Sequence, residues 1–280
     1  MKKGLVTIII PTKNSSEHLE KCLKKIKLQT YKNVEIIIVD DGKSKDIEKT
    51  TDIAKKHNCK LLIFDPKVKK GLFDATGKRN YAAKKVDGEF IYHMDADMEL
   101  TENIVKEAVE LCKSGFDAVI LTEDSFGEGP WARAKNLERR FFWGDETVES
   151  PRFFKKSVYD SLGGYDENIA GGGEDRDLYR EALKKGYKVK RTKSLVMHNE
   201  GKLKLIQLFK KQFMYKREAL KYLRKRPSAA IQSYFPIRRS HITNWKMFAS
   251  RPVDTFFFVI MKTAELLGGV AGFLYSLVER

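Results

Sequence analysis

The sequence Phe90-Ile91-Tyr92-His93-Met94-Asp95-Ala96-Asp97 carries the clearest structural pattern in this chain of 280 residues. Its first five residues are mostly apolar or aromatic, which is typical of a buried β-strand, and two carboxylates spaced one residue apart follow. Residues i and i+2 of a strand project to the same side, so we expect Asp95 and Asp97 to converge just beyond the strand. Two oxygen ligands there suit Mg²⁺ or Mn²⁺. Taken alone, the two acids also fit a strand that ends in solvent.

Strand-like and helix-like segments alternate around this stretch. Strands are predicted at residues 5–10, 34–39, 60–64, 90–94 and 117–122, and helices at 16–29, 46–57, 76–85 and 102–113. The β-branched run at 5–10 is typical of a parallel strand buried on both faces, and Ser15 or Ser16 can cap the helix after it. The alternation predicts an α/β protein with a doubly wound, mostly parallel sheet flanked by helices.

Polar residues gather where the predicted parallel strands end. The carboxyl ends of parallel strands share one edge of a sheet, which is where ligands bind in open α/β sheets. Three strand ends supply polar groups to this edge: Pro11, Thr12, Lys13 and Asn14; Asp40 and Asp41; Asp95 and Asp97. A loop and helix before the last of these strands add Gly71, Gly77, Arg79 and Asn80. The sequence therefore predicts one binding site along this edge.

The positive charge of the chain is concentrated in one segment. The formal net charge is +16, and residues 202–251 contain fourteen Lys or Arg residues and one acid, Glu218, so this segment alone carries +13. Such a surface attracts phosphates, on lipid head groups or on nucleic acid. The three cysteines, Cys22, Cys59 and Cys112, form no CxxC pair, which favours ordinary buried thiols and a reducing compartment. The apolar run at 5–10 is too short for a secretory signal.

Six motifs, in order along the chain, resemble family 2 glycosyltransferases, which are nucleotide-sugar-dependent enzymes of the GT-A fold. The resemblance covers residues 4–200. The motifs are Thr7-Ile8-Ile9-Ile10-Pro11-Thr12-Lys13-Asn14, Glu35-Ile36-Ile37-Ile38-Val39-Asp40-Asp41-Gly42, Lys78-Arg79-Asn80-Tyr81-Ala82-Ala83, Asp95-Ala96-Asp97, Gly163-Gly164-Tyr165-Asp166-Glu167 and Gly172-Gly173-Glu174-Asp175-Arg176-Asp177-Leu178. The resemblance specifies the fold and the reaction type and leaves the sugar open.

The resemblance implies roles for the predicted edge residues. A divalent cation, Mg²⁺ or Mn²⁺, neutralises charge on the nucleoside diphosphate leaving group and is held by Asp95 and Asp97, with Asp95 also facing the donor. The remaining donor-binding residues are Pro11, Thr12, Lys13, Asn14, Asp40, Asp41, Gly71, Arg79 and Asn80. A turn cap is an equally good interpretation of Asp40-Asp41-Gly42, and a helix surface pair is the alternative for Arg79 and Asn80.

The resemblance places the general base in the second acidic motif. We expect Asp175 to take the proton from the acceptor hydroxyl, with Glu174 as the second candidate, although acids in a first helical turn also complement the helix dipole. A single base without a nucleophile implies inversion at the anomeric carbon. His198 is either a third metal ligand, as in related GT-A enzymes, or structural. Trp131, Trp143 and Arg152 lie in the stretch that the resemblance assigns to the acceptor, where core packing explains an aromatic residue equally well.

The segment after residue 200 has the composition of a membrane-associating region. Apolar residues at 203–223 alternate with Lys and Arg, as in basic amphipathic helices at a membrane surface. The apolar stretch 256–278 is long enough to cross a bilayer, but Lys262 and Glu265 near its middle would each cost about 2.5–3.5 kcal/mol there unless they pair at i,i+3. We therefore expect an in-plane or hairpin-like anchor rather than a span, with a helix packed on the catalytic domain as the alternative.

These observations together predict a GT-A catalytic domain at 1–200 and a helical, basic and apolar membrane-associating region at 201–280. The expected activity is that of a metal-dependent inverting glycosyltransferase, moving a hexosyl-type sugar from a UDP- or GDP-sugar to a hydroxyl of a lipid-linked saccharide or glycolipid. It would act peripherally or monotopically on the cytoplasmic side of an anionic membrane, without nucleic acid. The alternatives are a polyprenyl-phosphate glycosyl synthase, whose phosphate acceptor needs no base, and a catalytically silent membrane or nucleic-acid adaptor.

Overall fold

A computed structural model describes residues 1–65, 75–169, 173–217 and 243–278, with the single positions Leu223, Pro227 and Ser240. The chain divides into two units. Unit 1 comprises Met1–Thr122, Ser150–Glu167 and Leu178–His198, and unit 2 comprises Glu123–Glu149, Asn168–Asp177 and Asn199–Arg280. The division at residue 200 into a catalytic and a membrane-associating part stays a prediction.

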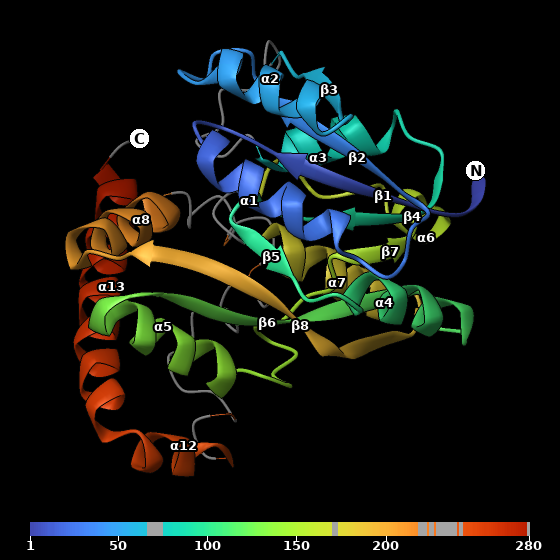
Figure 1. Cartoon of the computed structure of the whole chain (residues 1–280). Helices are drawn as coiled ribbons and strands as arrows, with labels where there is room; N and C mark the ends of the chain where they lie inside the picture. The colour runs from blue at the N-terminus through green and yellow to red at the C-terminus, as the bar shows by residue number, and fades with distance from the viewer. Residues whose placement is uncertain are drawn as a thin grey trace. The chain divides into compact units, whose positions relative to one another are not determined.

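The central element is a mixed β-sheet of eight strands. The strands are β1 (Lys2–Pro11), β2 (Val34–Asp40), β3 (Lys60–Ile63), β4 (Gly88–His93), β5 (Met98–Leu100), β6 (Ala118–Glu128), β7 (Phe153–Lys155) and β8 (Val189–Lys202). Their order is β3-β2-β1-β4-β7-β6-β8-β5 (Figure 1). The β1–β2, β2–β3 and β1–β4 pairs are parallel, whereas β7 is antiparallel to β4 and β6, and β5 is antiparallel to β8. This confirms the predicted α/β class with a mixed sheet.

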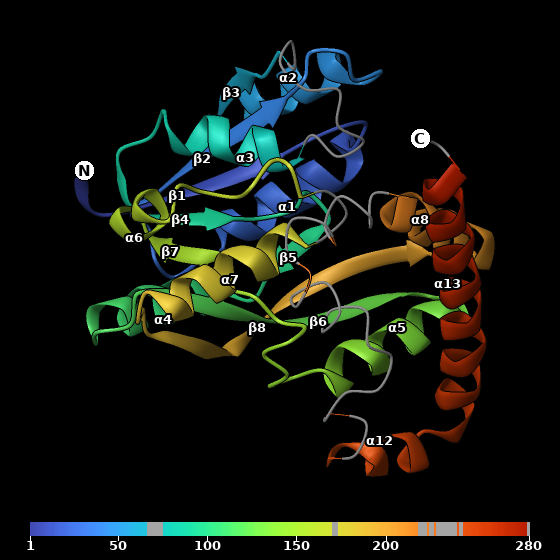
Figure 2. The same ribbon diagram turned by 180° about the vertical axis from the view of Figure 1, so that it is seen from behind.

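Helices cover both faces of the sheet in unit 1. They are α1 (Ser16–Lys27), α2 (Ile47–Lys56), α3 (Ala75–Ala83), α4 (Ile104–Lys113), α6 (Lys156–Ser161) and α7 (Glu174–Lys184), of which α7 begins in unit 2. Figure 1 shows α1 in front of the sheet, and Figure 2, from behind, shows α3 and α7 in front of it. The predicted strands and helices are thus present, with ends that differ by a few residues.

The alternating direction of side chains along each strand explains why helices cover both faces of the sheet. In β1, Ile8 and Ile10 pack into one core with α1 and α4, whereas Ile9 packs into the opposite core with α3 and α6. Ile91 of β4 joins the Ile9 side, and its neighbours Phe90 and Tyr92 join the other. Because successive strand residues point to opposite faces, a continuous apolar run fills both cores at once.

The structure adds elements that the sequence patterns did not predict: β5, β7, α6 and the helix α5 (Gly129–Phe141). It also corrects the predicted cap of α1. Ser15 occupies the N-cap position but makes no capping bond, because its hydroxyl accepts a hydrogen bond from the Lys13 amide at 3.4 Å. The amide of Ser16 donates instead to the Asp46 carboxylate at 2.8 Å.

Unit 2 contains a long apolar helix, α13 (Pro252–Val278), which packs against α5 and α8 (Leu205–Arg217) and follows the short helix α12 (Trp245–Ser250). Within the described part of the chain, α13 alone is long and apolar enough to cross a membrane by length and composition, with a mean hydropathy of 1.6 over its most apolar window. Its glycines allow a close approach to α8. A Cβ atom at Gly268 or Gly272 would lie 2.3 Å from the Phe209 carbonyl oxygen and 2.1 Å from the Phe213 carbonyl oxygen, respectively.

This close approach predicts opposite effects for neighbouring glycines. Gly272→Ala should lower the free energy of unfolding by about 1–3 kcal/mol, because the added methyl group forces the backbones of α8 and α13 apart. Gly269→Ala is the matched control: its Cβ would meet only the flexible Lys216 side chain, at 3.3 Å, and the helix gains about 1 kcal/mol of propensity. Denaturant unfolding of both variants measures the difference, and equal midpoints would contradict it.

Candidate active site

The carboxyl ends of the parallel strands meet at one edge of unit 1. The Thr12 amide, just after β1, donates to the Val39 carbonyl of β2 at 2.8 Å, and the Met94 amide, just after β4, donates to the Ile9 carbonyl of β1 at 3.0 Å. The polar residues after β1, β2 and β4 therefore share this edge, as the sequence predicted.

Asp40, at the end of β2, organises the first part of the site. Its fully buried carboxylate accepts hydrogen bonds from the Ser44 hydroxyl at 2.8 Å, the Gly42 amide at 2.9 Å and the Thr12 hydroxyl at 3.0 Å. The Asn14 side chain in turn accepts from the Lys45 amide at 2.7 Å. These bonds support the turn-cap interpretation of Asp40, which ties the loop after β1 to the loop after β2. Its direct contact with a nucleotide stays a prediction.

A buried lysine that the sequence analysis did not assign lies beside Asp41. Lys78, in α3, is fully buried, donates to the Thr12 carbonyl at 2.9 Å and lies 3.9 Å from the Asp41 carboxylate. Burial would raise the pKa of Asp41, but the Lys43 amide and the charges of Lys78 and Lys13 outweigh burial and lower it. The signal in the sequence was the position of Lys78 next to Arg79 in the same motif.

Two guanidinium groups hold Asp95. One carboxylate oxygen pairs with Arg79 of α3 and the other accepts from Arg152, just before β7, at 2.6 Å. Burial would raise the pKa of Asp95, but the charges of Arg152 and Arg79 outweigh it and hold this pKa well below its ordinary value. Arg152, which the sequence placed in the acceptor stretch, is therefore an Asp95 partner.

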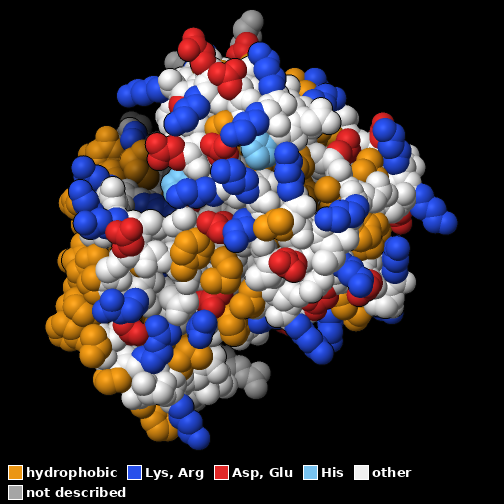
Figure 3. All heavy atoms as spheres, in the orientation of Figure 1, with side chains coloured by type: hydrophobic (Ala, Val, Ile, Leu, Met, Phe, Trp, Pro, Cys, Tyr) orange, Lys and Arg blue, Asp and Glu red, His pale blue; other side chains and the backbone are white. Residues whose placement is uncertain are grey.

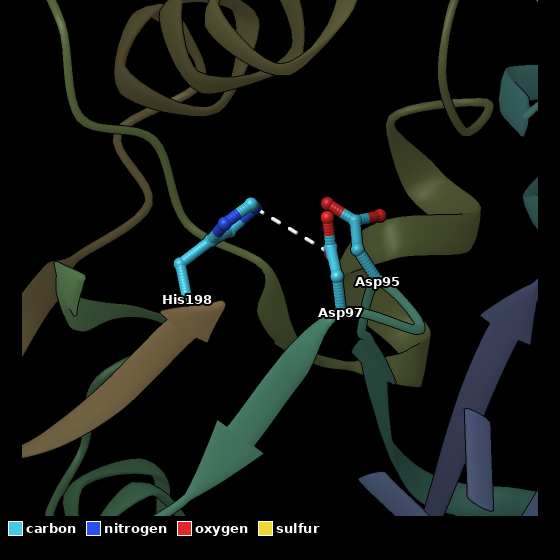
Figure 4. A group of neighbouring side chains, drawn as sticks. All are labelled: Asp95, Asp97 and His198. Atoms are coloured by element: carbon cyan, nitrogen blue, oxygen red, sulfur yellow. Dashed lines mark ion pairs between the residues drawn. The ribbon is translucent and has the colours of Figure 1, made fainter. Parts of the chain in front are cut away.

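Asp97 and His198 come together through the pairing of two strands. Met98 at the start of β5 is paired with His198 in antiparallel β8, which places His198 Nε2 3.5 Å from Asp97 Oδ1 (Figure 4). One ligand atom each of Asp95, Asp97 and His198 lies within 4.8 Å of the others. The two aspartates lie in the turn between β4 and β5, and Ala96 between them packs into the core. The predicted convergence of Asp95 and Asp97 is present, and His198, for which the sequence left a structural role open, lies with them.

Asn80 joins α3 to the Gly163-Gly164-Tyr165-Asp166-Glu167 motif. Its amide oxygen accepts from the Tyr159 hydroxyl at 2.8 Å and the Tyr165 amide at 3.0 Å, and its amide nitrogen donates to the Tyr165 carbonyl at 2.8 Å and to Glu167 at 3.0 Å. Gly164 has φ +74°, and a Cβ there would lie 2.7 Å from Asn80 Oδ1, which explains the glycine. The structure shows a tethering role for Asn80, and its donor contact stays a prediction.

The structure describes some of the remaining predicted residues. Glu174 and Asp175 form the first turn of α7 in unit 2, with Glu174 buried and Asp175 half-buried. Gly71 and Gly172 lie outside the described residues. Of the two tryptophans in the predicted acceptor stretch, Trp131 packs edge-on against Phe257 with ring centroids 5.2 Å apart, and Trp143 donates its ring N–H to the Glu123 carbonyl at 2.7 Å.

Residues 7–165 match the model of Glycosyl transferase family 2. The chain therefore belongs to this family, and the resemblance seen in the motifs is confirmed.

Two curated relatives and one solved structure show what the chain is similar to within the family. The chain is 25% identical over 167 residues to the "GalNAc(5)-diNAcBac-PP-undecaprenol beta-1,3-glucosyltransferase" of Campylobacter jejuni, covering 56% of this chain and 53% of that protein. It is 28% identical over 174 residues to the "Poly(ribitol-phosphate) beta-N-acetylglucosaminyltransferase TarP" of Staphylococcus aureus, covering 57% and 51%. The chain thus spans about half the length of both relatives.

The structural similarity extends over nearly the whole chain. A mannosyltransferase from Pyrobaculum calidifontis, solved in complex with GDP-Man and Mn²⁺, superimposes with a TM-score of 0.61 at 17% identity, covering 98% of this chain and 86% of that one. At this identity the likeness shows the fold, and the expected GT-A architecture is confirmed.

The tether at Asn80 predicts a graded loss of stability. Asn80→Ala removes four hydrogen bonds and leaves buried partners unsatisfied, so the free energy of unfolding should fall by about 3 kcal/mol or more. Tyr159→Phe removes only one of these bonds and should cost about 1 kcal/mol. Denaturant unfolding measures both variants, and an Asn80→Ala cost no larger than that of Tyr159→Phe would contradict the tether.

Proposed function

We propose that this protein is an inverting glycosyltransferase that transfers a sugar from a UDP- or GDP-sugar to a hydroxyl of a membrane-borne acceptor. The observation that carries this proposal is the convergence of Asp95, Asp97 and His198 at the carboxyl edge of the parallel strands, in a chain of family 2. The relation to proteins named for sugar transfer supports the reaction class.

The donor set fits a divalent cation. Asp95 and Asp97 contribute carboxylates and His198 an imidazole, and the exposed part of Asp97, 39% of its side chain, leaves room for further ligands. Carboxylates suit Mg²⁺ and Mn²⁺, and an added imidazole favours Mn²⁺ of the two. When bound, the cation would neutralise negative charge on the diphosphate.

The residues around Asp95 would then orient the donor. Arg79 and Arg152 keep Asp95 ionised and fix both of its oxygens, so the turn that carries Asp97 is held before the donor arrives. Preorganised charge of this kind lowers the reorganisation needed during the reaction. Lys78 and Asp40 would hold the loops after β1 and β2, where we place the nucleoside.

Asp175 is the proposed general base. Its carboxylate would accept the proton of the acceptor hydroxyl while the oxygen attacks the anomeric carbon and the nucleoside diphosphate leaves. A single displacement of this kind inverts the anomeric centre. Glu174 is the second candidate, and its burial makes it the less accessible of the two.

The acceptor is proposed to be a lipid-linked saccharide or glycolipid. One relative is named for an undecaprenol-linked substrate, and the basic segment 202–251 with the apolar helix α13 suits an anionic membrane surface. We place the protein on the cytoplasmic side of that membrane, attached peripherally or monotopically. A polyprenyl-phosphate acceptor is the alternative within the enzyme class, and a silent adaptor is the alternative outside it.

Donor binding is expected to depend on Mn²⁺ through Asp97. A saturating UDP- or GDP-sugar with Mn²⁺ should raise Tm by about 5 °C, because a ligand bound by the native state stabilises it. Asp97→Ala should abolish the metal-dependent part of this shift. Asp52→Ala, at an exposed aspartate of α2, is the control and should keep it. The silent adaptor would give no shift with any nucleotide sugar.

Transfer is expected to depend on Asp175 separately from donor binding. Asp175→Asn should keep the Mn²⁺-dependent thermal shift and lower kcat by about 10²–10⁴-fold, because the hydroxyl loses its proton acceptor. Glu174→Gln is the matched variant and should retain more activity. Radiolabelled sugar transfer to membrane lipids measures both. Full activity of Asp175→Asn would refute this base and favour a phosphate acceptor.

A further inference from the structure

Helix α13 has two different faces within unit 2. Its buried residues recur every three or four positions and pack against the protein: Phe258, Met261, Glu265, Gly268, Gly272 and Ser276. Between them lie six large hydrophobic residues, which we call the apolar face: Phe256, Val259, Leu266, Leu267, Val270 and Leu274. Each of these six is between 49% and 63% exposed. The helix therefore turns a largely apolar stripe, interrupted by the exposed Thr263, away from the residues it packs on.

The charges of α13 lie on the protein side. Lys262 donates to Glu138 of α5 at 2.8 Å and also pairs with Glu265, as the i,i+3 spacing predicted. Lys135 of α5 lies 3.5 Å from Glu265 and also pairs with Glu138. We call these four residues the ion quartet. The carboxylates of Glu138 and Glu265 are only 8% and 5% exposed.

The ion quartet holds α13 on α5. Burial would raise the pKa of Glu138, but the charges of Lys135 and Lys262 outweigh burial and hold this pKa well below its ordinary value. Separating the two helices would break the Lys262–Glu138 and Lys135–Glu265 pairs and leave each buried carboxylate with one cation instead of two, which is unfavourable. One to two turns further along the helix, Gly268 and Gly272 let α13 pack closely against the backbone of α8.

These contacts conflict with a helix that crosses a bilayer. A spanning α13 would either carry the ion quartet and charged α5 into hydrocarbon or pull away from both α5 and α8. Charged side chains are costly at the centre of a bilayer. A helix lying in the plane of the interface keeps all these contacts and buries only the apolar face.

Exposed lysines lie just before α8, and within α8 and α12, the two helices that contact α13. Lys202, Lys204, Lys210, Lys211 and Lys246 are exposed. Figure 3 shows hydrophobic side chains along the side of the molecule where Figure 1 places α13, with Lys and Arg side chains beside them. Apolar residues bordered by cations match the boundary of an anionic bilayer, where acyl chains lie beside phosphate groups.

We propose that the apolar face of α13 lies flat in the interface of an anionic lipid bilayer, with α5 and α8 still packed on its opposite side. The chain would thus be monotopic. This docking surface does not depend on the transfer reaction, because neither the donor nor the predicted base takes part in it.

Charge complementarity favours lipid over a second copy of the chain. Two copies meeting through α13 would bring together the exposed lysines of α8 and α12, the helices that contact it: Lys210, Lys211 and Lys246. Like charges oppose that contact, whereas anionic head groups attract the same residues.

Vesicle sedimentation of the full chain without donor tests the proposal. The protein should bind vesicles of equal parts phosphatidylcholine and phosphatidylglycerol more tightly than phosphatidylcholine alone, and high salt should weaken the difference. Leu267→Asp should lower the partition coefficient about tenfold or more. Leu28→Asp is the matched control, because Leu28 in unit 1 is 57% exposed and Leu267 is 58% exposed. Circular dichroism confirms that both variants fold.

Three results would overturn the proposal. The first is equal vesicle binding by Leu267→Asp and Leu28→Asp. The second is a protein that binds neither kind of vesicle and forms a dimer in sedimentation velocity. If Leu267→Asp makes that dimer monomeric, a second copy of the chain is the occupant of the apolar face. Because these assays use no donor, their failure is distinct from a failure of donor binding or sugar transfer.

The third result concerns the orientation of the helix. Two variants, each also carrying Cys59→Ser, place a single new thiol at one end of α13: Val253→Cys at the start and Val278→Cys at the end. In inside-out membrane vesicles from the expressing host, an impermeant maleimide should label both positions. Protection of one end until detergent is added would show that α13 crosses the bilayer.

Discussion

The parallel pairing of β1 with β2 and β4 is the constraint on which the candidate site depends. It places the ends of three strands at one edge, so residues from the loops after each strand meet there. Asp40 and Asp95 then fix those loops, one through hydroxyl and amide donors and the other through two guanidinium groups. The antiparallel β5–β8 pair adds His198 from about a hundred residues further along the chain.

The parts of the fold that local sequence determines were predictable. A run of β-branched residues such as residues 5–10 has few alternatives to a strand buried on both faces. Asp95 and Asp97 converge as their spacing predicted, but they do so in the turn between β4 and β5 rather than on a strand, with Ala96 between them packed inward. Motif order then identified the family, because six short patterns in sequence order restrict the fold far more than any one of them does.

Other features depend on contacts that local patterns do not encode. Strands β5 and β7 are three residues long and exist because longer strands pair with them. Arg152 reaches Asp95 across 57 positions, and Lys78 reaches Thr12 across 66. Helix α5 is different, because a proline in its first turn was a usable signal for the start of a helix. Its buried residues Ala134 and Leu137 nevertheless pack in one cluster with residues of α8 and α13, much further along the chain.

Composition alone does not determine how α13 meets a membrane, because a spanning helix and an in-plane helix can contain the same residues. A spanning helix and an in-plane helix differ in the direction in which their charged side chains point. In a spanning helix, Lys262 and Glu265 would gain from pairing only with each other. Here Lys262 and Glu265 also pair with residues of α5, and glycines on the same side of α13 contact the backbone of α8. The charged pair and the glycines of α13 therefore face protein. What faces outward is apolar over several turns, apart from Thr263. Exposed apolar patches rimmed by polar residues mark interaction sites, and the interface of a bilayer matches a helix whose one side meets protein and whose other side is apolar.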